Sequence, residues 1–460
     1  MTELSAHARS ATVRNPRVQV FDVPPTDLSL SARREVRVNP QTTGLNPISF
    51  QVEPSRDWIN LDKSFFEIEL RLKLADGNNV VQGTRTVLAN NLAHSLFKQI
   101  SVRLNGTLLS PQTDNYHLLA FFETLLNNDK QDGEDLLAPQ GWYNCLDVPS
   151  DGVADELTAN ALDPTNAEFR ALSEDQKNIV LSRVKFLGGN RVILRFTPAL
   201  EVFRLGKLLK PNVQIQVEMH LNNPSLWSIR YHGTDLIRLT EDDINVRFFV
   251  QQVKVEDSVY RDLATALNSG KRCTYPTVRS EIRTYAHPTD NRHFEADNPF
   301  HGQVPNRIIV AFLKQTAFNG VVTENPYEFG KFNLKTLKLL VSGEEYPYET
   351  LELNHDNGHK DYRGYHRFLE ASGCFTRGHG NLVGPEDWGH GKRCNLYVFD
   401  TTANDSLDAP VLNPKQTGNI RIVADFGANP GSNLTVVVYG EFENLLEITG
   451  EGTVTYDVHQ

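Results

Sequence analysis

The stretch KQISVRLNG, from Lys98 to Gly106, has a counterpart in the second half of the chain, KTLKLLVSG, from Lys335 to Gly343. Both stretches have the composition of a β-strand, and both end in a turn that contains glycine. A strand that recurs together with its turn indicates that a larger structural unit is repeated within the chain.

Three further pairs of segments follow in the same order in both halves. A short helical pattern comes first, LLAFFET (118–124) in the first half and YHRFLEA (365–371) in the second. Two strand patterns then follow in each half. They are KPNVQIQVEMHLNNP (210–224) with TGNIRIVADFGANP (417–430), and INVRFFVQQVKVE (244–256) with SNLTVVVYGEFEN (432–444). We therefore predict an all-β protein made of two tandem eight-stranded jelly rolls with short flanking helices. One large irregular β-domain is the alternative.

The repeat divides the chain into four parts. We predict an N-terminal arm at 1–45, a first jelly roll at 46–267, a second jelly roll at 268–450 and a C-terminal tail at 451–460. The arm contains six Arg and four Asp or Glu and little periodicity. It is interpreted as a segment that becomes ordered against a partner, with a loosely attached strand as the alternative.

An acidic insertion near 127–178 is present in the first half only. It holds twelve Asp or Glu and three Lys or Arg, so it carries a net charge of -9 out of the -11 of the whole chain. This overall charge argues against wholesale wrapping of nucleic acid, which requires basic surfaces.

Alternation along single strands predicts which side chains face the core. In SFFEIELRLKL (64–74), Phe66 and Ile68 alternate with Glu67 and Glu69, so the two glutamates should face water. In the same way, alternation around Ile282 predicts a wet strand face for three charged side chains. These are Arg279, Glu281 and Arg283. The helical patterns around Phe121 and Phe368 are expected to cap the two rolls.

Neither a membrane span nor a secretion signal is recognisable. No apolar run approaches the roughly 20 residues that cross a bilayer. The N-terminal residues lack the apolar core of a signal peptide, and four cysteines do not make a disulfide framework. We therefore expect a protein that is synthesised and retained inside a cell.

Several segments are similar to a known protein family. They are NPFHGQVPNRIIVAFLKQTAFNG (298–320), NPYEFGKFNLKTLKLLVSGEEYP (325–347), YRGYHRFLEASG (362–373), NLYVFDTT (395–402) and, in the first half, FRLGKLLKPNVQIQVEM (203–219). These segments resemble the double jelly-roll major capsid proteins of Polinton/Maverick-like elements and related small eukaryotic DNA viruses. The resemblance is good over Val278–Thr402 and extends to the first half through its strand order.

The resemblance implies a structural role. Each subunit of that family stands two jelly rolls side by side, and three subunits make a pseudo-hexagonal capsomer that tiles an icosahedral virion shell. The expected partners are two further copies of the chain, neighbouring capsomers and minor or vertex capsid proteins, with no sequence-specific nucleic acid binding. The acidic insertion should then form part of a tower on the outer surface, because its charge would repel packaged DNA. The arm suits the inner face or a neighbouring capsomer.

A candidate zinc site lies in CFTRGHGNLVGPEDWGHGKRC (374–394). Its possible ligands, Cys374, His379, His390 and Cys394, follow the order Cys-x4-His-x10-His-x3-Cys. Thiolates and imidazoles are the ligands that zinc prefers, and structural sites usually bring them in close pairs. His390 and Cys394 have this spacing, and Cys374 and His379 lie at its outer edge. The glycine content and the place between a helix and a strand favour a loop. We therefore interpret the segment as a loop, with zinc as the alternative.

No catalytic chemistry is predicted, and no cofactor is expected. Three adjacent acidic pairs, Glu344-Glu345, Asp242-Asp243 and Glu256-Asp257, could supply the two carboxyls of glycoside hydrolysis, but solvated turns explain them better, because charged residues prefer the surface. Phosphate-binding glycine motifs are missing from the sequence.

A protein that binds or processes glycans is the alternative function. Tandem jelly rolls also occur in such proteins, where carboxylates and tryptophans lie in a groove between the rolls. Trp142, Trp227 and Trp388 are predicted in loops and could stack on sugars.

Overall fold

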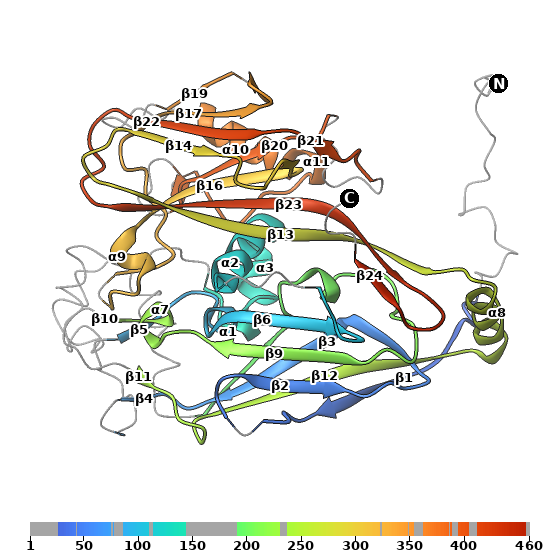
Figure 1. Ribbon diagram of the computed structural model, residues 1–460. Helices are drawn as coiled ribbons and strands as arrows, with labels where there is room; N and C mark the ends of the chain where they lie inside the picture. Colours follow the sequence, from blue (N-terminus) through green and yellow to red (C-terminus); the bar gives the residue numbers. More distant parts are fainter. Residues whose placement is uncertain are drawn as a thin grey trace, which may run out of the picture.

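The computed structural model describes most of the chain outside its N-terminus and its long insertion. The described residues are 26–42, 44–74, 77, 86–109, 114–143, 191–230, 237–322, 324–347, 349–353, 362–385, 387–388, 394–403 and 412–456. Two β-sandwiches lie one above the other, and their strands run in nearly the same direction (Figure 1).

The first sandwich, called the first roll, consists of two four-stranded sheets. Their strand orders are β1-β12-β3-β8 and β2-β9-β6-β7. The strands are β1 (Leu30–Val38), β2 (Ile48–Val52), β3 (Trp58–Leu70), β6 (Phe97–Leu104), β7 (Thr107–Leu108), β8 (Val192–Phe196), β9 (Ile215–Leu221) and β12 (Ile244–Val255). Two short ribbons extend one end of this roll. They pair β4 (Lys73–Leu74) with β11 (Ile237–Arg238), and β5 (Thr86–Leu88) with β10 (Ser228–Arg230).

The second sandwich, called the second roll, repeats this plan with the orders β13-β23-β16-β20 and β14-β22-β17-β18. Its strands are β13 (Cys273–His287), β14 (His293–Asp297), β16 (Arg307–Lys314), β17 (Leu334–Val341), β18 (Glu344–Glu345), β20 (Leu396–Asp400), β22 (Ile420–Phe426) and β23 (Leu434–Ile448). Further pairings join β24 (Val454–Tyr456) to β23, β19 (Leu351–Glu352) to β17, and β15 (Gln303–Val304) to β21 (Gln416–Thr417).

The repeat predicted from the sequence is confirmed by these sheet positions. The stretch KQISVRL falls in β6 and KTLKLLV in β17, and both strands are third in their sheets. In the other two strand pairs, β9 with β22 and β12 with β23, the two members also hold the same position, which is the second in each sheet. The chain therefore has two copies of one strand order.

Part of the predicted N-terminal arm is a strand of the first roll. β1 lies at the edge of its sheet and pairs antiparallel with β12 from Leu30 opposite Val255 to Val38 opposite Phe248. Its charged residues fall on both faces, so its sequence has no apolar alternation that predicts a strand. Backbone pairing to one neighbour positions it, and charges are common on an edge strand because they discourage further pairing.

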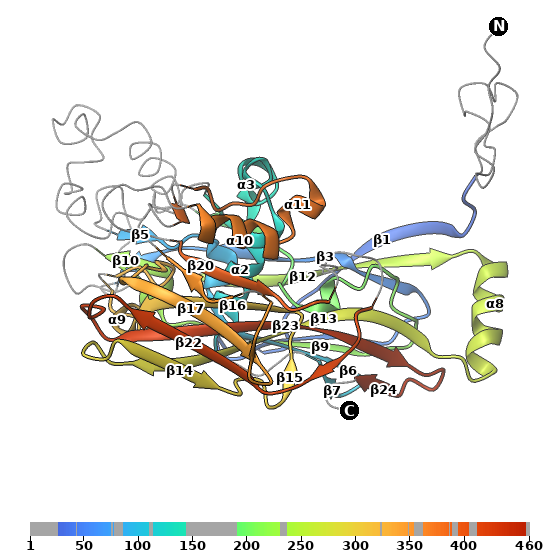
Figure 2. The same ribbon diagram turned by 90° about the horizontal axis from the view of Figure 1, so that it is seen from above.

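Helices connect and flank the two rolls. They are α1 (Leu92–Ser95), α2 (Tyr116–Asn127), α3 (Lys130–Asp135), α7 (Pro224–Trp227), α8 (Asp257–Asn268), α9 (Gln315–Phe318), α10 (Arg363–Ala371) and α11 (Cys374–Arg377), with 3-10 turns η2 (Ala138–Gln140) and η4 (Glu201–Phe203). α8 joins β12 to β13 at one end of the molecule, and Figure 2 shows it beyond the ends of the sheets. The Glu256 side chain caps α8 by accepting a hydrogen bond from the Ser258 backbone N–H.

The packing of α10 leads to a prediction. Gly364 lies where a Cβ atom would overlap the Trp388 ring and lie 2.8 Å from Leu353 Cδ2. Gly364→Ala should therefore lower the free energy of unfolding by about 1–3 kcal/mol, because the buried neighbours must shift. Gly380→Ala is the matched control, since no atom lies within 4 Å of its Cβ position. Equal melting temperatures for the two variants in thermal denaturation would contradict this packing.

Candidate functional site: the junction between the two rolls

The two rolls meet around α2. Aromatic rings on this helix contact rings of the second roll: the Phe121 and Tyr327 centroids are 4.7 Å apart, and the Phe122 and Phe329 centroids are 5.1 Å apart. Phe122 also packs edge-on against Tyr439 at 5.8 Å. α2 lies between the two sandwiches in Figure 1, so it fills the space between them in addition to covering the first roll. Of the 12 residues of α2, all but Asn127 are buried.

A chain of polar contacts crosses the junction beside these rings. Glu123 of α2 pairs with Arg204 and accepts a hydrogen bond of 3.4 Å from Ser280 Oγ in β13. Ser280 Oγ lies 3.0 Å from the Tyr439 hydroxyl, which donates to Glu441 Oε1 at 2.8 Å. Burial raises the pKa of the Glu123 carboxyl even though Arg204 opposes the shift. This chain of contacts links a helix of the first roll to two strands of the second.

A second set of contacts lies at the C-terminal strand. Lys210 Nζ donates to the backbone oxygens of Thr449 and Gly450, each at 2.9 Å. The Tyr456 hydroxyl donates to Glu201 of η4. β24 thus ties the end of the second roll to the first.

Burial raises the pKa of Glu201 to about 8, with the hydrogen bond from Tyr456 opposing the shift. The folded state therefore holds this proton more tightly than the unfolded state, whose carboxyl has a pKa near 4.5. The stability contributed by this carboxyl is complete below pH 4.5, declines as the pH rises, and is lost above about pH 8. We expect the free energy of unfolding to fall by up to about 1.4 kcal/mol per pH unit in this window.

Glu201→Gln should flatten this pH dependence, measured by denaturant unfolding from pH 5 to 8. Glu344→Gln, at an exposed glutamate of β18, is the control and should leave the dependence unchanged. An unaltered slope in Glu201→Gln would contradict the assignment.

The junction also explains a buried arginine. The sequence predicts a wet strand face for Arg279, but its residue is only 4% exposed. Its guanidinium lies 4.5 Å from the centroid of the Phe442 ring, pairs with Glu281 and acts electrostatically on Glu201. Its Nη2 also donates to Gln303 Oε1 at 2.9 Å. Alternation within one strand does not reveal which distant segments will cover a charged side chain.

Glu67 and Glu69 differ from the prediction in a similar way. Each is only 7% exposed. Arg195 Nη2 lies 2.8 Å from Glu67, and Arg247 Nη2 lies 3.1 Å from Glu69. The arginines of the neighbouring strands cover the carboxylates and neutralise them.

No family model matches the chain. An uncharacterized protein of Caenorhabditis elegans is 21% identical over 407 residues, which cover 86% of this chain and 89% of that protein.

Solved structures match over nearly the whole chain. The PBCV-1 virus capsid model matches with a TM-score of 0.59 and 12% identity, over 95% of this chain and 99% of that chain. The mavirus major capsid protein matches with a TM-score of 0.54 and 12% identity, over 99% and 96%. The Faustovirus major capsid protein matches with a TM-score of 0.53 and 11% identity, over 95% and 92%. The chain has the double jelly-roll fold of viral major capsid proteins.

The structure of this double jelly-roll fold describes three of the four zinc candidates. Cys374 begins α11, with its Sγ 3.4 Å from Ser372 Oγ, and burial raises the pKa of the Cys394 thiol well above its usual value. His379 is exposed, with its Nδ1 2.9 Å from the Gly380 carbonyl oxygen. His390 lies outside the described residues. Over the described ranges, no group of three His, Cys, Asp or Glu could hold a metal ion. The four-residue zinc set stays an untested prediction.

The three tryptophans of the glycan alternative are all buried in the double jelly roll. Trp142, Trp227 and Trp388 are 3%, 1% and 2% exposed, respectively. The Trp388 indole N–H donates to the Leu396 carbonyl oxygen at 2.8 Å, and Trp142 packs against Phe121. None of the three presents a ring to a ligand.

The acidic pairs have separate local roles. Glu344 and Glu345 form the exposed strand β18. Asp243 accepts hydrogen bonds from Thr240 and pairs with Lys73 at 2.5 Å, whereas Asp242 is exposed. No helix in the described part of the double jelly roll is long and apolar enough to cross a bilayer.

Proposed function

We propose that the protein is a non-enzymatic structural subunit of a viral capsid, which forms homotrimers that act as pseudo-hexagonal capsomers of an icosahedral shell. The observation that carries this proposal is the presence of two rolls with one strand order, joined into one body at the α2 junction. Three such chains supply six similar wedges around one axis. A closed ring of this kind buries complementary surface without open-ended growth.

The two ends of the subunit suit the two sides of a shell. The acidic insertion follows α2 and the chain then returns to the first roll at β8, whose start pairs with the end of β3. The first residues of the chain lead into β1, whose start pairs with the end of β12 beside α8. The chain therefore returns from the insertion at the end of the first roll that is opposite to the arm. An outward insertion keeps its net charge of -9 away from packaged DNA. Residues 144–178 of this acidic segment lie outside the described residues; its charge and the return of the chain to β8 support the outer position.

Light scattering after size exclusion tests the proposal directly. One chain has a mass of 51.9 kDa, so a trimer has three times this mass, 155.7 kDa. A trimer that persists on dilution, together with pseudo-hexagonal particles in electron micrographs, is the expected result. A monomer at all concentrations would overturn the proposal.

Limited proteolysis of assembled shells tests the orientation. Cleavage should occur within 127–178, and the N-terminal arm should be protected until the shells are dissociated. The reverse pattern would place the acidic segment inside. The expected partners in the shell are neighbouring capsomers and minor or vertex capsid proteins, in a virion assembled inside the host cell.

The glycan alternative loses its expected binding place between the rolls. That space is filled by Phe121 and Phe122, whose side chains are at most 2% exposed. Any ligand site must therefore lie elsewhere on the surface.

A further inference from the structure

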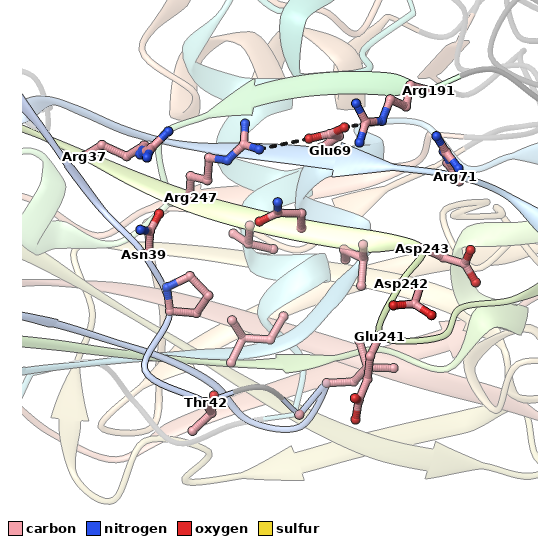
Figure 3. A pocket seen from close by; sticks show the side chains of 17 residues that line it. Arg37, Asn39, Thr42, Glu69, Arg71, Arg191, Glu241, Asp242, Asp243 and Arg247 are labelled. Atoms are coloured by element: carbon pink, nitrogen blue, oxygen red, sulfur yellow. Dashed lines mark hydrogen bonds and ion pairs between the residues drawn. The ribbon is translucent and has the colours of Figure 1, made fainter.

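A cavity of about 710 Å³ opens on the first roll, away from the junction. Its walls come from the ends of β1, β3 and β8, the segment between β1 and β2, and the start of β12 (Figure 3). The start of β12 lies at the opposite end of that strand from α8. The cavity is therefore at the end of the roll where the long insertion returns to the sheet at Arg191. Its volume is that of an ordinary small-molecule site.

Four arginines form one wall of the cavity, as Figure 3 shows. Arg247 is 3.1 Å from Glu69, and Arg191 pairs with the same carboxylate. Arg37 and Arg71 are exposed, and no carboxylate of the described residues lies within ion-pair distance of either. Two guanidinium groups with planar, paired donors are thus available to a carboxylate or sulfate.

The opposite side of the cavity has hydrogen-bond acceptors. Glu241 and Asp242 are exposed there, and Asn39 and Thr42 line the same opening (Figure 3). Asp243 is already bonded to Thr240 and Lys73, so it is not one of the available acceptors. Buried apolar side chains form the floor. They are Ile48, Ile244 and Val246.

We propose that this cavity binds an anionic saccharide. The acid group pairs with Arg37 or Arg71, the sugar hydroxyls donate to the carboxylates of Glu241 and Asp242, and a C–H face of the ring lies over the apolar floor. A phosphodiester chain fits less well, because it has few hydroxyl donors and its charges are repelled by the two exposed carboxylates. Binding itself does not depend on the capsid role. If the proposed orientation of the subunit holds, the site faces outward on the shell.

Isothermal titration calorimetry of the full chain provides the test. The probes are 3′-sialyllactose, which carries a carboxylate, and a heparin-derived tetrasaccharide, which carries sulfates, with lactose as the neutral comparison. At least one anionic probe should bind about tenfold more tightly than lactose, since charge-assisted hydrogen bonds are the stronger kind. The combined variant Arg37→Gln and Arg71→Gln should lose about tenfold or more in affinity. Arg33→Gln, on the same strand but outside the cavity, should bind as wild type.

Asp242→Ala separates recognition from simple charge attraction. The proposal expects weaker binding, because a hydroxyl acceptor is lost. General attraction of an anion to the arginines would instead give tighter binding, because a negative charge is removed.

Three further results would overturn the inference: no binding of either probe at about 10 mM, equal binding by the Arg37→Gln and Arg71→Gln variant, or binding of a short single-stranded DNA alone. Light scattering on the same samples reports the oligomeric state separately. Failure of the capsid proposal is therefore distinguishable from failure of this one.

Discussion

Phe122→Ala should loosen both rolls at once. The ring is 0% exposed, and the two rings that it contacts, Phe329 and Tyr439, both belong to the second roll. Removing it leaves a cavity at the junction, and the free energy of unfolding should fall by about 3–5 kcal/mol. Hydrogen exchange measured by mass spectrometry should become faster in α2 and also in β23, because each roll loses packing that the other supplies.

Phe50→Ala is the matched control. Phe50 is equally buried, but its ring neighbours, Phe66 and Phe248, are in the first roll. This variant should lose a similar amount of stability while the faster exchange stays within the first roll. If Phe122→Ala also left exchange in β23 unchanged, the aromatic contacts would not couple the rolls.

Arg307→Met should be as damaging as the loss of a large core residue. The Arg307 and Glu441 side chains are only 4% and 12% exposed, and Nη1 lies 3.3 Å from Oε2. Removing the cation leaves the Glu441 carboxylate buried with the Tyr439 hydroxyl as its remaining donor in the polar chain. Such an uncompensated charge should reduce the free energy of unfolding by about 3–5 kcal/mol in denaturant titrations.

The double variant Arg307→Met with Glu441→Gln tests the cause. A neutral amide can still accept the hydrogen bond from Tyr439, and it needs no counter-ion. Most of the lost stability should therefore return, and the two substitutions should be strongly non-additive. Additive losses would show that Arg307 acts through its packing and not through its charge.

The repeated strand order could be predicted because its signals are local. A strand with one apolar face, such as Ile215–Leu221, buries Ile215, Val217 and Met219 to 0% exposure, as the period of two predicts. The turn at Gly106, with its positive φ of 86°, has a counterpart at Gly343 with 93°. The sequence of each pair of segments was therefore sufficient to predict that its two members hold the same position in their sheets.

The junction could not be predicted because its signals are not local. Arg279 has the sequence neighbours of a solvent-facing strand residue, but it contacts Gln303 and Phe442, which are distant in sequence, and acts electrostatically on Glu201 of η4. β1 has no apolar period, so its pairing with β12 depends on backbone hydrogen bonds that a sequence pattern does not reveal. The cavity likewise combines Arg37 and Asp242, which are distant in sequence.

The helix α8 has a thermodynamic consequence for the rest of the chain. Because α8 joins the two rolls covalently, it holds the second roll near the first at an effective concentration on the order of millimolar. This effect of the tether is independent of the contacts at the junction. The junction then does not have to overcome the entropy of bringing two free molecules together. Buried acids such as Glu123 and Glu201, whose desolvation is unfavourable, can be tolerated there. In the proposed homotrimer, the interfaces between separate chains would have no such tether, so we expect them to contain fewer buried charges than the junction does.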